Sequence, residues 1–152
     1  MTREELQASL LEKMEGLAAE EGGQWLNVKV PAGKWPELMA MLRKNEEYLF
    51  DYMFCLTCVD WLKHLTMVYH LESTKHRHIL VVKIDLPREN PVVHTSCHLW
   101  RTAEFHEREV FEMFGVHFDK HPDLRNLILP DDWIGRNPMR KDFEDPVNMI
   151  KL

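Results

Sequence analysis

The sequence lacks the features that most directly reveal an enzyme. It has no GxGxxG, P-loop, GxSxG or HExxH pattern, so no nucleotide, flavin or nucleophile site can be placed on it. Its longest uncharged apolar run, residues 52–59, is far shorter than a membrane helix of ~20 residues, and the N-terminus has no signal-peptide pattern. We therefore expect a protein of the cytosolic side, held at any membrane only by other chains.

Basic residues are also few and scattered. The net charge is −6 and the pI is near 5.8, whereas a nucleic-acid binder needs a clustered basic surface to neutralise phosphates. This excludes nucleic acid as a partner.

Cysteine is scarce as well, with three residues and no framework spacing, which indicates a reducing compartment without structural disulfides. Cys55 and Cys58 form a CxxC, but they lie in an apolar, strand-like run that puts the two thiols on opposite faces. A redox pair needs a helix N-terminus instead. One alternative stays open: a stand-alone zinc or thiol enzyme that joins this pair to His94, Cys97 and His98, although HxxCH is not a recognised zinc spacing.

The remaining pattern predicts one α+β domain, since 152 residues suffice for a single core. A capping box at Thr2 and Glu5 starts a first helix that runs to Gly22-Gly23, with Leu6, Leu10, Met14 and Leu17 on one face. Further helices are predicted at 34–44 and 102–114, with Gly115 as the C-terminal cap of the second. Strands are predicted at 25–30, 52–60, 65–72 and 76–86. We expect a two-layer body of helices on a mixed, mostly antiparallel sheet, with an extended C-terminal arm.

We interpret the charged residues and histidines of two of these elements as structural and not catalytic. On the third helix, Arg108 is four residues from both Glu104 and Glu112, which predicts two ion pairs. Glu107 and Glu109 lie about 200° apart on that helix and do not form a catalytic pair. On the last strand, His76 and His78 share one face, which we interpret as a solvated edge.

The segment from residue 107 to 143 organises the chain. Beyond Gly115 it is rich in apolar residues, yet Pro122, Pro130 and Pro138 prevent it from forming a long helix or central strand. We predict a body at 1–115 and an extended arm at 116–152 that docks on a partner protein. Its proline content and lack of period predict that 119–152 is largely mobile in isolation.

The same segment resembles the signature of the C subunit of the proton-pumping NADH:quinone oxidoreductase (respiratory complex I), the 30 kDa subunit family. Weaker similarity extends upstream through Val59-Asp60 to most of the chain. The sequence departs from the pattern at Phe105, Glu112, Asn126 and Asn137, the last resembling an insertion. The residues that carry the signature, and that the resemblance assigns to a partner interface, are Glu107, Arg108, Glu109, Glu112, Gly115, His121, Pro122, Asp123, Leu124, Arg125, Pro130, Asp131, Asp132, Trp133, Gly135, Arg140, Lys141, Asp142 and Phe143. Met113, Phe114, Leu127, Ile128 and Leu129 also match the signature.

The resemblance implies a peripheral-arm subunit without catalytic, cofactor or metal residues of its own. FMN, Fe-S clusters and quinone would be bound by neighbouring subunits. This chain would scaffold the large quinone-cavity subunit, known as the D type, beside Fe-S subunits on the cytoplasmic face of the bacterial inner membrane. Within the arm, Arg108, Arg125, Arg140 and Lys141 are expected to make charge-assisted bonds, with Trp133 and Phe143 as apolar anchors.

Related complexes share this type of subunit. The alternatives are the equivalent subunit of a membrane-bound energy-converting hydrogenase, of an F(420)H(2) dehydrogenase, or of the plastid and cyanobacterial ferredoxin-dependent form. The sequence leaves the electron donor open.

Overall fold

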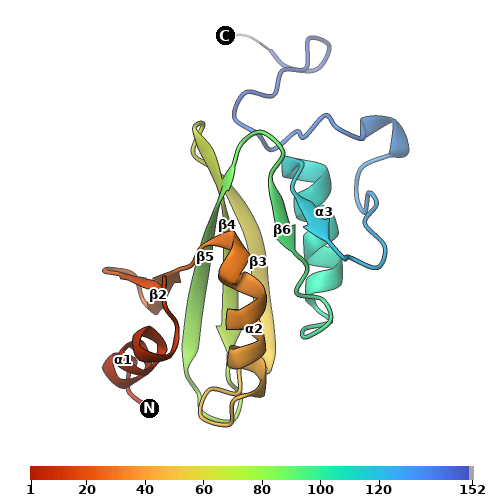
Figure 1. The fold of residues 1–152 in the computed structure, drawn as a ribbon. Coiled ribbons are helices and arrows are strands. Elements are labelled where there is room, and N and C mark those ends of the chain that lie inside the picture. Colours follow the sequence, from red (N-terminus) through yellow and green to blue (C-terminus); the bar gives the residue numbers. More distant parts are fainter. Residues whose placement is uncertain (151–152) are drawn as a thin grey trace.

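The structure, a computed structural model, describes residues 1–150, so residues 151–152 of the predicted arm lie outside it (Figure 1). Its elements follow in the order α1 (Arg3–Lys13), β1 (Ala18–Glu20), β2 (Leu26–Lys29), a 3-10 turn (Ala32–Lys34), α2 (Trp35–Lys44), β3 (Tyr52–Asp60), β4 (His64–Glu72), β5 (Ile79–Pro87), β6 (Val92–His94), α3 (Ala103–Phe114), β7 (His117–Asp119) and a second 3-10 turn (Asp131–Trp133).

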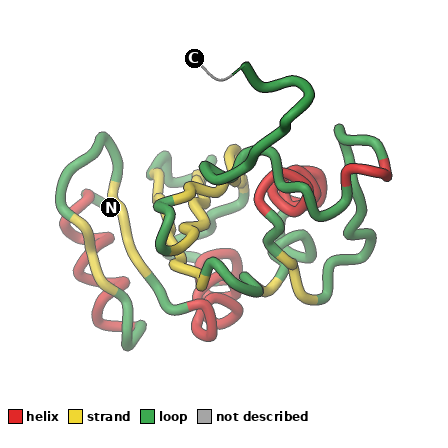
Figure 2. The backbone as a smooth tube through the Cα atoms, turned by 90° about the horizontal axis from the view of Figure 1, so that it is seen from above, coloured by secondary structure: helices red, strands yellow, loops and turns green. Residues whose placement is uncertain are grey.

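The main sheet has five strands in the order β1-β2-β5-β4-β3. Only β2 and β5 pair in parallel, and every other pair in this sheet is antiparallel. α1 and α2 lie on one side of the sheet, and α3 lies beside β3 (Figures 1 and 2). β6 and β7 form a separate parallel pair. The predicted α+β body with a mixed, mostly antiparallel sheet is therefore confirmed.

The core lies between the helices and the inner face of the sheet. Alternate residues of β4 point inward, and the Tyr69 ring packs at a tilt against Trp35 of α2 with ring centroids 4.4 Å apart. Trp100, just before α3, is also buried and donates its indole N–H to the Phe50 carbonyl at 2.8 Å. These aromatic contacts join α2, the sheet and the start of α3, and so fix where α3 stands.

Two predicted elements differ from the structure. The first helix has the predicted capping box but ends at Lys13, because Met14 is extended; β1 then occupies part of the expected helix. β5 begins only at Ile79, so His76 and His78 lie in the preceding turn. His78 is buried and hydrogen-bonds the Tyr48 carbonyl through Nε2 at 2.9 Å, so the prediction of a solvated edge is wrong for it.

The CxxC lies inside β3, as predicted. Cys58 is buried in the core and Cys55 is half-exposed on the other face of the sheet. Burial, with the nearby Asp60 carboxylate, raises the pKa of Cys58 to about 12, so this thiol stays protonated and unreactive.

α3 ends at Gly115, which adopts the predicted left-handed conformation with φ of 77°. Val116 and Phe118 beyond it are fully buried, and β7 pairs with β6, so the packed core continues past residue 115. None of the helices within residues 1–150 is both long and apolar enough to cross a membrane.

Gly115 provides a test of how the arm returns to the body. A Cβ on Gly115 would lie 2.6 Å from the side-chain nitrogen of Asn137, whereas a Cβ on Gly135, also at positive φ, would meet nothing within 4 Å. We expect Gly135→Ala to cost about 1 kcal/mol of unfolding free energy from backbone strain alone, and Gly115→Ala to cost more because Asn137 must move. Urea denaturation measures both. Equal losses would mean that Asn137 does not pack over Gly115.

Candidate partner-docking site

Glu112 of α3 holds the arm by its backbone. Its carboxylate accepts hydrogen bonds from three consecutive backbone N–H groups, those of Leu127, Ile128 and Leu129, each with a shortest distance of 2.9 Å. The carboxylate is buried, and these donors compensate for its lost hydration. A stretch without regular structure thereby has its N–H groups satisfied.

Arg108, one turn earlier on α3, binds the preceding residues of the arm by their carbonyl groups. Its Nε donates to the Arg125 carbonyl at 3.0 Å and an Nη to the Asn126 carbonyl at 2.7 Å. The guanidinium also lies over the Phe105 ring, 5.6 Å from the centroid. The predicted ion pairs of Arg108 with the flanking glutamates are therefore wrong within the described chain, because arm backbone groups bind the Arg108 guanidinium and the Glu112 carboxylate instead.

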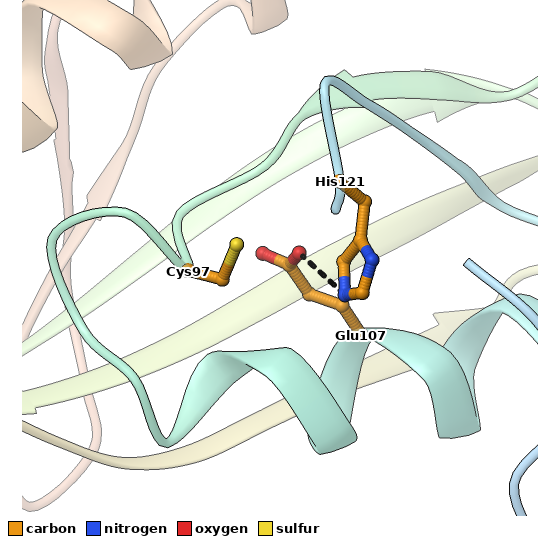
Figure 3. A group of neighbouring side chains, drawn as sticks. All are labelled: Cys97, Glu107 and His121. Carbon is orange, nitrogen blue, oxygen red and sulfur yellow. Dashed lines mark ion pairs between the residues drawn. The ribbon is translucent and has the colours of Figure 1, made fainter. Parts of the chain in front are cut away.

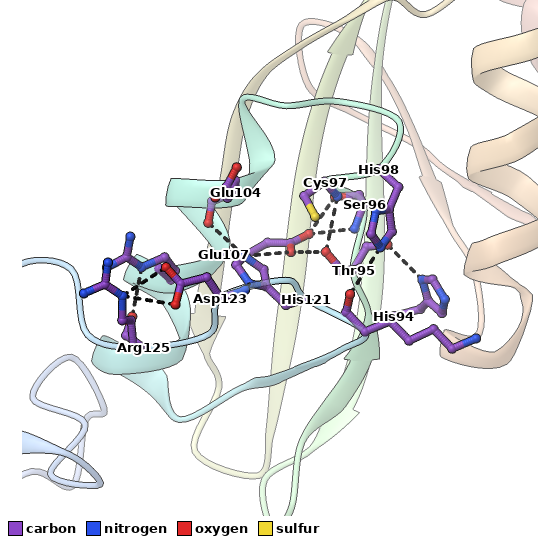
Figure 4. Close-up of polar contacts among 12 residues, drawn as sticks. His94, Thr95, Ser96, Cys97, His98, Glu104, Glu107, His121, Asp123 and Arg125 are labelled. Carbon is purple, nitrogen blue, oxygen red and sulfur yellow. Dashed lines mark hydrogen bonds and ion pairs between the residues drawn. The ribbon is translucent and has the colours of Figure 1, made fainter.

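Glu107, on the neighbouring face of α3, is fully buried and joins three segments (Figure 4). Its carboxylate accepts from the Ser96 backbone N–H and hydroxyl, both at 2.8 Å, and from the Thr95 hydroxyl. His121 lies 3.8 Å away, donates through Nε2 to the Glu104 carbonyl at 3.0 Å, and accepts the Asp123 N–H at Nδ1. This network attaches the start of the arm and the residues after β6 to α3.

The same place contains the residues most like a metal site. Ligand atoms of Cys97, Glu107 and His121 lie within 4.8 Å of one another (Figure 3). Both nitrogens of His121 and both carboxylate oxygens of Glu107 already make hydrogen bonds, however. Burial also raises the pKa values of Cys97 and Glu107, which disfavours the charged forms that bind metals. The arrangement therefore fits a structural hydrogen-bond network better than a metal centre.

The structure does not bring together the cysteines and histidines of the zinc site that the sequence left open. Among residues 1–150, the one metal-compatible group of three contains Cys97 but none of its supposed partners at 55, 58, 94 and 98. His94 bonds through Nδ1 to the Thr95 carbonyl, and His98 bonds through Nε2 to the Lys120 carbonyl at 3.2 Å.

Asp60, at the end of β3, holds a later part of the arm. Its carboxylate accepts from the Lys141 N–H at 2.9 Å and the Leu62 N–H at 2.7 Å, and it pairs with Arg88. Arg88 in turn bonds Asp142 of the arm at 2.6 Å. Burial alone would raise the pKa of Asp60, but the hydrogen bonds from Arg88 and the two N–H groups lower it to about 2.

Between these points the arm also returns to the end of α3. Arg140 donates through Nε to the Phe114 carbonyl at 2.7 Å, and the Met139 N–H bonds the Met113 carbonyl at 3.1 Å. Together with the bonds to Glu112 and Asp60, these contacts attach the arm to the body at three places.

The apolar side chains of the arm point largely away from this attachment. Ile128 and Ile134 are each 63% exposed, although both belong to a segment whose backbone is anchored nearby. Trp133, expected to be an anchor for a partner, is half-buried, 6.3 Å from Phe143 and beneath Arg136. The exposed apolar side chains of the arm are Leu127, Ile128, Ile134, Met139, Val147, Met149 and Ile150.

Comparison with known proteins identifies the family. The family described as "Respiratory-chain NADH dehydrogenase, 30 Kd subunit" matches residues 28–147. The chain belongs to this family. It is 39% identical over 129 residues to the NADH-quinone oxidoreductase C subunit of Moorella thermoacetica, covering 84% of this chain and 85% of that protein.

Two further relatives are longer than this chain. The NADH-quinone oxidoreductase C subunit of Chloroherpeton thalassium is 39% identical over 112 residues, covering 72% of this chain and 46% of that protein. The NADH-quinone oxidoreductase C/D subunit of Phocaeicola vulgatus is 39% identical over 127 residues, covering 82% of this chain and 24% of that protein. The chain thus spans about half the length of the first and a quarter of the second.

Solved structures agree with this assignment. A chain of the membrane-bound sulfane sulfur reductase, an archaeal respiratory membrane complex, superposes with a TM-score of 0.80 at 29% identity, covering 93% of this chain and 85% of that one. A trypsin-resistant fragment of Nqo5 superposes with a TM-score of 0.69 at 28% identity, covering 81% of this chain and all of that one.

The signature of the 30 kDa subunit family thus contains two kinds of residue. Those that hold the chain's own backbone face inward, whereas others, such as Glu109, are exposed. Asp123 and Arg125 pair with each other at the surface. The exposed members beyond these are Pro122, Leu127, Ile128, Pro130, Asp131, Asp132, Gly135, Lys141 and Asp142.

Sequence reasoning missed Arg88, Thr95 and Ser96, which lie in loops and bind the signature residues Asp142 and Glu107. Nothing in their local pattern marks them, because their role depends on contacts with distant segments.

The contact between Asp60 and the arm can be tested by measuring how the stability of the fold depends on pH. The folded pKa of Asp60, about 2, lies below the unfolded value of about 3.9, so Asp60 stabilises the fold above pH ~4, and this contribution is lost as the pH falls toward 2. We expect Asp60→Asn to lower stability at pH 7 by about 2 kcal/mol and to flatten the pH dependence below pH 4. Urea titrations across pH measure this. An unchanged slope below pH 4 would contradict it.

The Glu112 contact can be tested by hydrogen exchange. Glutamine at this position loses the charge and one acceptor oxygen, so we expect the amides of residues 127–129 to exchange about tenfold faster in Glu112→Gln. Glu109→Gln, on the exposed side of the same helix, serves as the control and should leave these amides unchanged. Equal protection in both variants would show that Glu112 does not hold the arm.

Proposed function

We propose that this chain is a peripheral subunit of a quinone-reducing NADH dehydrogenase complex, and that it scaffolds the large quinone-cavity subunit, of the D type, through its arm. The observation that carries the proposal is the outward face of the anchored arm. Glu112, Arg108 and Asp60 satisfy its backbone, and they leave apolar side chains in water that would be stabilised by burial against another protein.

The choice of partner rests on the relatives. Two matching proteins, from Phocaeicola vulgatus and Bacteroides thetaiotaomicron, carry the double designation C/D, which joins the C-type region to a D-type region in one protein. Subunits joined in this way are usually neighbours in the assembly of separate chains. A D-type large subunit, with Fe-S subunits nearby, is therefore the proposed surface for the arm.

The chemistry of the complex would then lie outside this chain. The residues of the candidate site fit structural roles, since their donors and acceptors are used in holding the arm. We therefore propose that FMN, Fe-S clusters and quinone belong to neighbouring subunits. We also propose that the chain reaches the cytoplasmic face of the membrane only through the complex.

A second candidate is the equivalent subunit of a related complex with another electron donor. The F(420)H(2) dehydrogenase C subunit of Methanosarcina mazei is 38% identical over 97 residues, and the sulfane sulfur reductase chain superposes over most of this protein. Purification of the native complex with this chain as bait, followed by mass spectrometry, separates the candidates by the input subunits that are recovered.

Docking is tested by placing a charge on the arm's outer face. Ile134→Asp alters a side chain that is 63% exposed, so the melting temperature should stay unchanged while recovery of the co-expressed large subunit from the same organism falls at least tenfold. Leu11→Asp changes an apolar residue of α1 that is 39% exposed, and it is the matched control that should retain binding. Full recovery with both variants would refute docking through this face.

A further inference from the structure

The hairpin tip between β3 and β4 exposes two large apolar residues beside the arm. Trp61 is 56% exposed and Leu62 is 57% exposed. The turn is held closed by the Trp61 N–H bonded to the His64 carbonyl at 3.0 Å and the Leu62 N–H bonded to Asp60 at 2.7 Å. The tip is therefore a small, ordered apolar projection.

Leu62 adopts a backbone conformation that leucine disfavours. Its φ is +69°, in the left-handed region where glycine and asparagine are usual at tight hairpin turns. Leu49 also has positive φ, but its side chain is half-buried. Leu62 has no comparable burial to offset its strain, so the fold of this chain does not account for leucine here.

The tip is continuous with the proposed docking surface. Lys141 of the arm lies over the Trp61 ring, 6.0 Å from its centroid, and its backbone N–H bonds Asp60 at the base of the turn. A partner that covers the arm at residues 139–142 would therefore extend onto Trp61 and Leu62.

We propose that Trp61 and Leu62 form a second contact with the large subunit that receives the arm, an inference that rests on the proposed function. The tip would enter an apolar recess rimmed by carboxylates, because Lys63 and Lys141 flank the two apolar side chains while Arg88 pairs with Asp60 and Asp142. Burial in the complex then offsets the strain at Leu62.

A single substitution separates this role from a structural one. Asparagine tolerates positive φ, so Leu62→Asn should keep or raise the melting temperature of the chain while it removes the apolar contact. We expect the Kd for the recombinant large subunit of the same organism to rise tenfold or more, which is about 1.4 kcal/mol. Biolayer interferometry on the full chain measures the Kd, and thermal unfolding measures stability.

Arg77 offers the matched control. It also has positive φ, at +58°, and is exposed at the turn between β4 and β5, at the other end of β4. Arg77→Asn should affect the melting temperature in the same direction as Leu62→Asn and leave the Kd unchanged.

The outcomes are distinct. An unchanged Kd for Leu62→Asn would overturn the tip contact. A lower melting temperature of the same variant would also overturn it. If both Leu62→Asn and Ile134→Asp still bind the large subunit, the proposed function is overturned. If Ile134→Asp loses binding and Leu62→Asn keeps it, only the tip contact is overturned. The alternative partner for a basic, apolar tip is a lipid surface, which sedimentation with phosphatidylglycerol vesicles tests. If Leu62→Asn abolishes this sedimentation and leaves the Kd for the large subunit unchanged, the proposal is refuted.

Discussion

The structure depends on how side chains of α3 provide hydrogen-bond partners for the irregular backbone of the arm. A segment interrupted by prolines cannot pair its N–H and C=O groups in a helix or sheet, and such groups are costly to leave without partners away from water. Glu112 provides acceptors for three consecutive N–H groups, and Arg108, one turn away, provides donors for the preceding carbonyls. Two buried charges thus replace the regular ladder that this sequence cannot form.

This arrangement separates the functions of backbone and side chains in the arm. The backbone contacts at α3, and those at Asp60, face the chain's own body, whereas side chains such as Ile128 and Ile134 face water. A surface ordered before binding loses less conformational entropy when it meets a partner. In the proposed docking, the buried charges of the family signature would support binding without touching the partner.

The local pattern predicted much of the body correctly. Residues 52–60 form a strand as expected, and Gly115 ends α3, because alternation and a glycine C-cap are local signals. The first helix was predicted too long because Met14 and Leu17 continue its apolar spacing, yet they reach the core from extended chain. The ion pairs of Arg108 were predicted from helical spacing alone, and competing backbone groups of the distant arm prevented them.

By itself the sequence determined the class of fold, the absence of familiar catalytic motifs and the membership of the 30 kDa subunit family, since these follow from local periodicity and from residue types at fixed spacing. The tertiary structure decided what the signature residues do. Glu107 binds Ser96, Glu112 binds Leu127 to Leu129, and Asp60 binds Lys141. These partners lie 11 to 81 positions apart, so only folding could bring them within hydrogen-bonding distance.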